Sequence, residues 1–279
     1  MKWKSYQIKV RSLDPEAART FLSGQPVDRV SILDVRQPVE YEAGHISGAR
    51  LIPLPELMDR MGEVPRDRPV LVYCKSGIRS RAACQLFAGG SFPGEVINLS
   101  GGFDFWEGGA ALGREDQGLA LFSGRESATE ILEVAYCLEQ GLGEFYLSMA
   151  DQVDNPEVQR LFSTLARMER LHQESILGEY GRLKGREVTP AVFEHRLAPG
   201  ALEGGMTTQE YIDYYMPDWD DPRDVVSLAM SIEAQALDMY LRAAARVENA
   251  LGRAALEKIA REEQTHMAHL GRLMETLSQ

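Results

Sequence analysis

The feature that most constrains this chain is a motif that occurs twice, with a constant spacing of 94 residues between the copies. In each copy a glutamate is followed seven residues later by a tyrosine and then, further along, by a Glu-x-x-His pair. Residues three apart share one face of a helix, so each pair presents a carboxylate and an imidazole to the same side. The repeat therefore predicts two similar helical hairpins that face each other. The two copies are Glu139, Tyr146, Glu169 and His172, and Glu233, Tyr240, Glu263 and His266.

Apolar periodicity in the second half predicts four long helices, because apolar residues recur there at i, i+3, i+4 and i+7. Asn155-Pro156 and Asp221-Pro222 each supply a capping side chain followed by proline at the first helical position. Approximately 40 residues join the second helix to the third, which is long enough to cross the bundle from end to end. They include a short predicted helix, TTQEYIDYYM. The four helices are expected at about 125–152, 156–183, 222–248 and 251–277.

The repeated glutamates and histidines are candidate metal ligands. A single glutamate on a helix is usually a solvated surface residue, but Glu139 and Glu233 interrupt apolar faces. A buried carboxylate is costly unless a cation or a proton compensates it. Four carboxylates and two imidazoles are the donor set of di-iron and di-manganese bundles, and the absence of thiolates disfavours structural zinc. We therefore predict two iron ions, with manganese as the alternative, held by Glu139, Glu169, His172, Glu233, Glu263 and His266.

Two further side chains near these ligands leave alternatives open. Tyr146 and Tyr240 follow their glutamates by two helical turns, so they either pack in the core with a satisfied hydroxyl or order the ligands and relay a radical. Cys137 lies two residues from Glu139, about 200° around the helix, and is expected to point away from the metals as a plain thiol.

The first half of the chain predicts a different fold. Short apolar runs at 30–35, 69–74 and 95–99 are typical of buried strands, and segments 14–22 and 79–87 are typical of helices. Strands that alternate with helices indicate an α/β domain with a mostly parallel sheet, ahead of the all-α bundle. A glycine-rich stretch at 108–124 separates the two patterns, so we predict domains at 1–118 and 119–279.

Cys74 is the candidate nucleophile of this domain. It ends the run PVLVY and opens the loop CKSGIRS, directly ahead of a helix. Backbone N–H groups at such a position, together with Lys75 and Arg79, are expected to stabilise its thiolate. Gly77 permits the tight curl of the loop. Cys84, on the following helix, is expected to be an inert core residue.

The segments LDVRQPVEYEAGHISGARLIPL, VLVYCKSGIRS and INLSGGFDFW together resemble a single-domain rhodanese over residues 28–108. The resemblance implies a persulfide on Cys74, taken from a small donor such as thiosulfate and passed to a thiol or to cyanide. Lys75 and Arg79 would contact the anionic donor. The six residues from Cys74 to Arg79 favour sulfur over phosphate, because related phosphatases use a longer C-x5-R cradle.

Further residues match the rhodanese pattern without an expected chemical role. Asp34, Arg36 and His45 are expected to make structural hydrogen bonds. Glu40 and Glu42 are expected to form salt bridges at the start of a helix.

The second half resembles the rubrerythrin-like branch of the ferritin-like family over residues 125–277. The resemblance implies a carboxylate-bridged di-iron centre that acts on peroxide or dioxygen through the six predicted ligands. Two departures matter. Ala236 stands where rubrerythrin has a further glutamate, and the chain lacks the two CxxC pairs of a rubredoxin module. Repeated peroxidase turnover would therefore need an external, rubredoxin-like electron donor, and ferroxidase or oxidase chemistry is the alternative.

Composition narrows the partners and the location. The 279 residues carry a formal charge of −12, which argues against nucleic acid or an anionic membrane as partner. The chain has no run of about 18 apolar residues and no signal-peptide pattern at its start, and its three cysteines form no CxxC pair. These features predict a cytoplasmic protein, and a homodimer through the helical bundle is a further expectation.

The leading hypothesis is a bifunctional sulfur and redox enzyme, in which Cys74 carries sulfane sulfur and the bundle reduces or activates an oxidant. One competitor is an iron-binding ferroxidase or storage-type protein whose rhodanese domain serves as a sensor or docking module. A second competitor treats the rhodanese domain as a degenerate interaction module. The intact Cys74 loop argues against the second.

Overall fold

The computed structural model describes residues 10–90, 92–106, 109–193 and 206–277. The chain forms two compact units, Met1–Arg114 and Glu115–Gln279. This division falls inside the glycine-rich stretch that predicts a boundary at 118/119. Each unit has its own architecture.

The first unit is built on a five-stranded sheet with strand order β1-β5-β4-β2-β3. Every pairing between these strands is parallel, which confirms the predicted α/β class. Strand β4 lies between β5 and β2 and is fully buried, so the loop after it emerges from the middle of the sheet. The strands are β1 (Arg11–Leu13), β2 (Ser31–Asp34), β3 (Arg50–Leu51), β4 (Val70–Tyr73) and β5 (Val96–Leu99).

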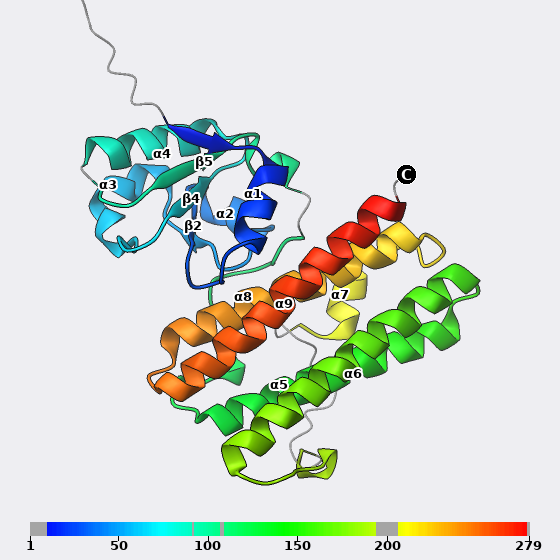
Figure 1. Ribbon diagram of the computed structural model, residues 1–279. Coiled ribbons are helices and arrows are strands. Elements are labelled where there is room, and N and C mark those ends of the chain that lie inside the picture. Colours follow the sequence, from blue (N-terminus) through cyan, green and yellow to red (C-terminus); the bar gives the residue numbers. More distant parts are fainter. Residues whose placement is uncertain (1–9, 91, 107–108, 194–205, 278–279) are drawn as a thin grey trace, which may run out of the picture. The chain divides into compact units, whose positions relative to one another are not determined.

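Helices cover both faces of this sheet (Figure 1). Alternate residues of a strand point to opposite faces, so Val70 and Val72 pack with Phe87, while Leu71 and Tyr73 pack on the other side. The helices are α1 (Pro15–Ser23), α2 (Pro38–Glu42), α3 (Leu57–Arg60) and α4 (Ile78–Gly89). Short 3-10 helices occur in both units, at Leu54–Glu56, Met61–Glu63, Gly102–Phe105, Leu119–Leu121 and Pro190–Val192.

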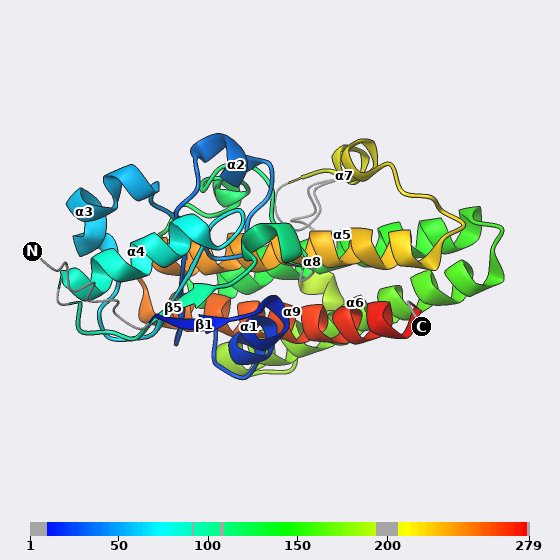
Figure 2. The same cartoon turned by 90° about the horizontal axis from the view of Figure 1, so that it is seen from above.

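The second unit is a ferritin-like bundle made of two helical hairpins. Its four long helices run side by side in both ribbon views (Figures 1 and 2). Helix α5 packs along α6 and α8 along α9, and the hairpins meet through α5 with α9 and α6 with α8. The short α7 lies in the long connection and packs on α8. The helices are α5 (Ala128–Gln152), α6 (Pro156–Lys184), α7 (Thr208–Tyr215), α8 (Pro222–Arg246) and α9 (Ala250–Leu277).

Local capping explains where these helices begin. The Asn155 side chain accepts a hydrogen bond from the N–H of Glu157, and Asp221 accepts one from Arg223, each ahead of a proline at the first helical position. Ser127 at the start of α5 forms a capping box with Glu130, which satisfies two backbone N–H groups at once. The predicted caps of α6 and α8 are therefore present.

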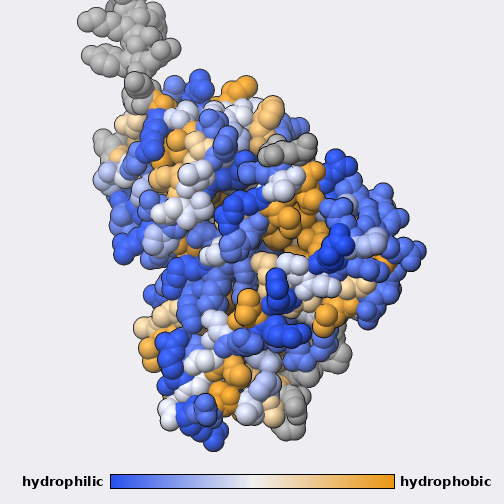
Figure 3. Space-filling model, turned by 45° about the vertical axis from the view of Figure 1, so that its right-hand side comes forward, coloured by the Kyte–Doolittle hydropathy of each residue, from blue (hydrophilic) through white to orange (hydrophobic). Residues whose placement is uncertain are grey.

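The chain carries a formal charge of −12. Hydrophilic residues cover most of the face in Figure 3, with apolar patches among them. No helix in the described ranges combines the length and the apolar character that crossing a bilayer requires.

Candidate active site and metal centre

Cys74 directly follows β4, and only 1% of its surface is exposed. The N–H of Gly77 donates a hydrogen bond to the Cys74 Sγ atom over 3.2 Å. Gly77 has φ +85°, and a Cβ there would lie 3.0 Å from the Gly101 nitrogen and the Leu99 oxygen. Glycine is therefore required for the loop to curl back over the sulfur.

A second loop holds the Cys74 loop in place. The N–H groups of Phe103 and Asp104 donate to the carbonyl oxygens of Cys74 and Lys75 over 2.8 and 2.9 Å. Gly102 belongs to this second loop and has φ +66°. A Cβ at this position would overlap the carbonyl groups of Cys74 and Lys75. The motif LSGGF after β5 thus fixes the backbone around the candidate nucleophile.

The surroundings of Cys74 favour its thiolate. Burial raises the pKa of the thiol, but the Ser80 hydroxyl and the backbone N–H groups of Ser80, Ser76 and Gly77 outweigh burial and lower it. The Ser80 hydroxyl has a single proton and lies 3.5 Å from Sγ but 2.6 Å from the Asn98 Oδ1 atom. Because that proton sits in the shorter bond, the backbone N–H groups are the main support of the sulfur's negative charge.

The other two cysteines have different surroundings. Cys84 lies in the core beside the sheet, where burial raises its pKa to about 12. Its thiol is therefore protonated at neutral pH. Cys137 is half-buried on α5 and belongs to none of the ligand groups found among the described residues.

The two predicted cationic partners of Cys74 are placed differently. The Arg79 guanidinium donates two hydrogen bonds to the Glu40 carboxylate, over 2.8 and 2.6 Å. These bonds lower the pKa of Glu40 to about 2, so the carboxylate stays ionised at neutral pH and neutralises Arg79. Lys75 is exposed at the start of the loop. Lys75 is thus the more accessible charge for an anionic donor, and Glu40 forms the salt bridge expected of it.

Asp34, Arg36 and His45 form structural contacts, as expected. The Arg36 Nε atom donates to Asp34 over 2.8 Å, its Nη2 atom donates to the Gly44 carbonyl, and its guanidinium lies 4.3 Å from the Phe103 ring centroid. The His45 ring stacks on Tyr41 with centroids 3.8 Å apart. These groups anchor α2 and the loop after β5 to the sheet.

The bundle brings all six predicted ligands together in its interior. Each hairpin supplies a glutamate from its first helix and a Glu-x-x-His pair from its second. All six side chains are buried, and the four glutamates are at most 1% exposed. The six are Glu139 on α5, Glu169 and His172 on α6, Glu233 on α8, and Glu263 and His266 on α9.

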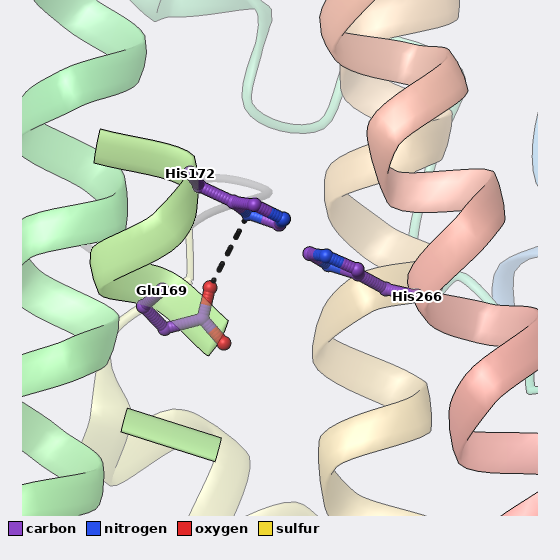
Figure 4. A group of neighbouring side chains, drawn as sticks. All are labelled: Glu169, His172 and His266. Atoms are coloured by element: carbon purple, nitrogen blue, oxygen red, sulfur yellow. Dashed lines mark ion pairs between the residues drawn. The ribbon is translucent and has the colours of Figure 1, made fainter. Parts of the chain in front are cut away.

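The two halves of this cluster have matching geometry. The His172 Nδ1 atom lies 3.2 Å from Glu139 Oε2 and 3.6 Å from Glu169 Oε2. In the other half, His266 Nδ1 lies 3.4 Å from Glu233 Oε2 and 3.6 Å from Glu263 Oε2. The two imidazole rings face each other across the bundle, stacked with centroids 3.6 Å apart (Figure 4). The 94-residue sequence repeat is therefore a repeat of local contacts as well.

The donor set fits iron or manganese. Three overlapping groups have ligand atoms within 4.8 Å of one another, and two of these groups span both hairpins. Burial raises the pKa of Glu233, but its hydrogen bond to His266 and the charge of that ring outweigh burial and lower it, so the ionised form that binds metal is favoured. Carboxylate oxygens with imidazole nitrogens suit iron and manganese. The groups are Glu169, His172 and His266; Glu139, His172 and Glu263; and Glu233, Glu263 and His266.

Other buried residues of the bundle bear on the predictions made from the sequence. Tyr146 and Tyr240 are buried at 1% and 0% exposure, with Tyr240 in edge contact with Phe122, and this placement leaves both of their predicted roles open. Ala236 is fully buried on α8 and offers no fifth carboxylate. Glu133 is a buried carboxylate that the sequence motifs do not include. It accepts a hydrogen bond from the Tyr180 hydroxyl over 2.9 Å and lies outside the ligand groups found among the described residues.

Comparisons with known proteins find a different family for each of the two units. The family model described as "Rhodanese-like domain" matches residues 14–108, and "Rubrerythrin" matches residues 130–216. The second copy of the ligand motif lies beyond that match, so its assignment to the same site rests on the geometry.

Curated relatives resemble the first unit. A sulfurtransferase of Allochromatium vinosum is 36% identical over 97 residues, which is 35% of this chain and 88% of the relative. Uncharacterized protein YqhL of Bacillus subtilis is 44% identical over 37% of this chain and 80% of the relative. The thiosulfate sulfurtransferase GlpE of Ectopseudomonas mendocina is 33% identical over 34% of this chain and 84% of that enzyme.

Proposed function

The chain belongs to the rhodanese family through its first domain and continues in a rubrerythrin domain, and on that premise we propose that it is a bifunctional sulfur and redox enzyme. Cys74 carries sulfane sulfur, and the four glutamates and two histidines of the bundle would hold two iron ions, which would supply the electrons for reduction of peroxide or dioxygen. The observation that carries the sulfur activity is the hydrogen bond from the Gly77 N–H to the Cys74 Sγ atom, together with the lowered pKa of the Cys74 thiol.

The sulfur reaction proceeds by two nucleophilic displacements. The Cys74 thiolate attacks the outer sulfur of thiosulfate, a new S–S bond forms, and sulfite leaves with the electron pair of the bond that breaks. An acceptor such as a thiolate or cyanide then attacks the outer sulfur of the persulfide and releases the Cys74 thiolate. The N–H of Gly77 stabilises the sulfur's negative charge at the start and at the end of the cycle. Lys75 attracts the anionic donor.

In the bundle, Glu139, Glu169 and His172 would hold one side of the metal pair, and Glu233, Glu263 and His266 the other. Two ferrous ions bound there would supply two electrons, which reduction of one peroxide to two waters consumes together with two protons. The chain's own contribution is a buried, preorganised set of anions that holds two cations close together and excludes bulk water.

The di-iron proposal predicts one round of oxidation per reduction. Anaerobic, ferrous-loaded protein mixed with hydrogen peroxide in a stopped-flow instrument should oxidise once and then stop, because the chain lacks the CxxC pairs of a rubredoxin module. Added reduced rubredoxin should restore turnover. Sustained peroxide consumption by Cys74→Ser protein without any donor would contradict this prediction.

Ala236 favours a second candidate for the bundle, a ferroxidase or iron-storage role with the rhodanese domain as a sensor or docking module. With alanine at this position, the cluster lacks the additional carboxylate of rubrerythrin. Iron titration in air separates the two, because storage accumulates many irons per chain whereas the redox enzyme saturates at two.

A further inference from the structure

Two fully buried polar side chains, Ser80 and Asn98, lie beside Cys74 in the core of the first unit. Ser80 is in the first turn of α4, and Asn98 is in β5. Successive residues of a strand point to opposite faces, and Leu99 packs on the face away from α4, so Asn98 points toward α4. A buried amide is unfavourable in an apolar core unless it is hydrogen bonded. Its partners therefore define its role.

These side chains form a hydrogen-bonded chain with Ser12. The Asn98 Oδ1 atom lies 2.6 Å from the Ser80 hydroxyl oxygen, and the Asn98 Nδ2 atom donates to the Ser12 hydroxyl over 3.3 Å. An amide oxygen can only accept, so the Ser80 hydroxyl is the donor in the first bond. The same hydroxyl oxygen lies 3.5 Å from Cys74 Sγ. A hydroxyl has one proton, so the proton that Asn98 holds is withheld from the sulfur.

The orientation of the Ser80 hydroxyl affects the two forms of Cys74 differently. With its proton turned to Asn98, the hydroxyl presents a lone pair to Sγ, which can accept a hydrogen bond from the neutral thiol but gives none to the thiolate. The backbone N–H of Gly77 still donates to the sulfur over 3.2 Å. The sulfur is therefore more basic than it would be with the Ser80 proton turned toward it.

Other ionisable groups around Cys74 act in addition to this chain and stay in place when Asn98 is changed. They come from the Cys74 loop, from α4 and from the segments packed around the loop. They are Lys75 in the loop, Arg79 of α4 with its partner Glu40 of α2, Arg81 and Cys84 of α4, Asp34 of β2 with its partner Arg36, and Asp104 after β5.

The basicity of Cys74 affects the two steps of sulfur transfer in opposite directions. In loading, the thiolate attacks the outer sulfur of thiosulfate, and sulfite leaves with the electron pair of the bond that breaks. In release, an acceptor such as cyanide attacks the outer sulfur of the persulfide, and the electron pair of the broken S–S bond returns to Sγ. A more basic thiolate is the better nucleophile in loading and the poorer leaving group in release.

We propose that Asn98 is a positioning residue of the sulfur site: it holds the Ser80 proton away from Cys74 Sγ and so speeds sulfur loading relative to sulfur release. The inference rests on the proposed sulfurtransferase function and adds to it a residue that acts through another side chain. No heavy atom has to move when the proton is released, because the Ser80 hydroxyl only has to rotate about its C–O bond to face the sulfur.

Asn98→Leu removes the amide oxygen and keeps a side chain of similar size. The released Ser80 hydroxyl should turn to Cys74 Sγ and stabilise the thiolate, so the pKa of Cys74 should fall. Alkylation of full-length protein by iodoacetamide over a range of pH, followed by peptide mass spectrometry, measures this pKa for Cys74 apart from the other cysteines. The midpoint of the alkylation profile should move to lower pH, and the plateau rate above it should also fall.

The two steps of sulfur transfer should change in opposite directions in Asn98→Leu. At a pH above both midpoints, loading from thiosulfate should slow about threefold, and release to cyanide should become about threefold faster. These factors follow from a hydrogen bond that changes the thiol–thiolate equilibrium about tenfold, at a Brønsted coefficient of roughly 0.4 to 0.5. Rapid mixing, with persulfide formation and thiocyanate formation followed separately, gives the two rates.

A double-mutant cycle shows whether Asn98 acts through Ser80. In Ser80→Ala protein, the further change Asn98→Leu should leave the pKa of Cys74 unchanged, because there is no hydroxyl proton to release. Asn98→Asp keeps an acceptor of the same shape and adds a negative charge, so it should raise the pKa. Ser12→Ala is the matched control, since it removes one hydrogen bond of Asn98 but leaves the amide oxygen for Ser80, and it should not change the pKa.

An unchanged pKa in Asn98→Leu would overturn the inference, and so would an equal fall with and without the Ser80 hydroxyl. Slower loading together with slower release would also overturn it, because Asn98 would then be needed only for the fold. The mass of each protein after thiosulfate treatment reports the proposed function separately. Sulfur uptake with an unchanged pKa in Asn98→Leu defeats only the role of Asn98, whereas no sulfur uptake by the unaltered protein defeats the function itself.

Discussion

Cys74→Ser is expected to lower thiosulfate:cyanide sulfurtransferase activity by on the order of 10³-fold or more, because a serine hydroxyl cannot carry the sulfur. Sulfur transfer requires a thiolate, and the lowered pKa of Cys74 favours one. Cys84 cannot replace it, since its pKa of about 12 keeps that thiol protonated in the core. Thiocyanate formation measures the activity, and peptide mass spectrometry after thiosulfate treatment locates the sulfur.

Cys137→Ser is the matched control, because Cys137 is a half-buried cysteine of the other unit. It should retain full sulfurtransferase activity. The metal content of Cys74→Ser should equal that of the unaltered protein, since thiolate chemistry and metal ligation occupy separate units. A persulfide on Cys84 or Cys137 in place of Cys74 would overturn the assignment.

Replacing Glu139 and Glu233 together by alanine should remove the metal pair. Each glutamate contributes the carboxylate that completes its own Glu-x-x-His helix, and each lies within 3.4 Å of the histidine of its half. Metal affinity should fall by more than about 100-fold, beyond the loss typical of residues that only orient ligands. Metal analysis after anaerobic loading and desalting measures the loss, with two ions per chain expected for the unaltered protein.

Thermal unfolding without metal separates loss of ligands from loss of the fold. The double variant should unfold no more than a few degrees below the unaltered apoprotein, because removing two of four buried carboxylates also removes their burial cost and mutual repulsion. Glu144→Ala changes an exposed glutamate on α5 and should leave metal binding intact. Full metal retention by the double variant would contradict the ligand assignment.

Local sequence signals were enough to predict the bundle. The apolar period and the capping residues Asn155 and Asp221 predict two of the helices. In the structure these helices begin at Pro156 and Pro222. The repeat predicts which residues the hairpins bring together, because the same contacts then form twice. Cys74 was identifiable because a strand, a glycine-containing loop and a helix follow one another directly.

Contacts between distant segments could not be predicted in the same way. Glu40 and Arg79 are 39 residues apart, and only the fold of the sheet brings α2 beside α4. The overlap that makes Gly102 necessary involves two loops whose approach no local pattern encodes. Strands β1 and β3 span three and two residues, too short for alternation to identify them.

Native mass spectrometry of a single sample tests the central claim, that one chain carries sulfur chemistry and a metal pair at separate sites. Protein loaded with ferrous iron under anaerobic conditions and then treated with thiosulfate should gain the mass of two iron ions and one sulfur atom on the same chain. Cyanide should remove the sulfur and leave the iron. A chain that binds fewer than two ions, or that gains sulfur only after losing its iron, would contradict the account.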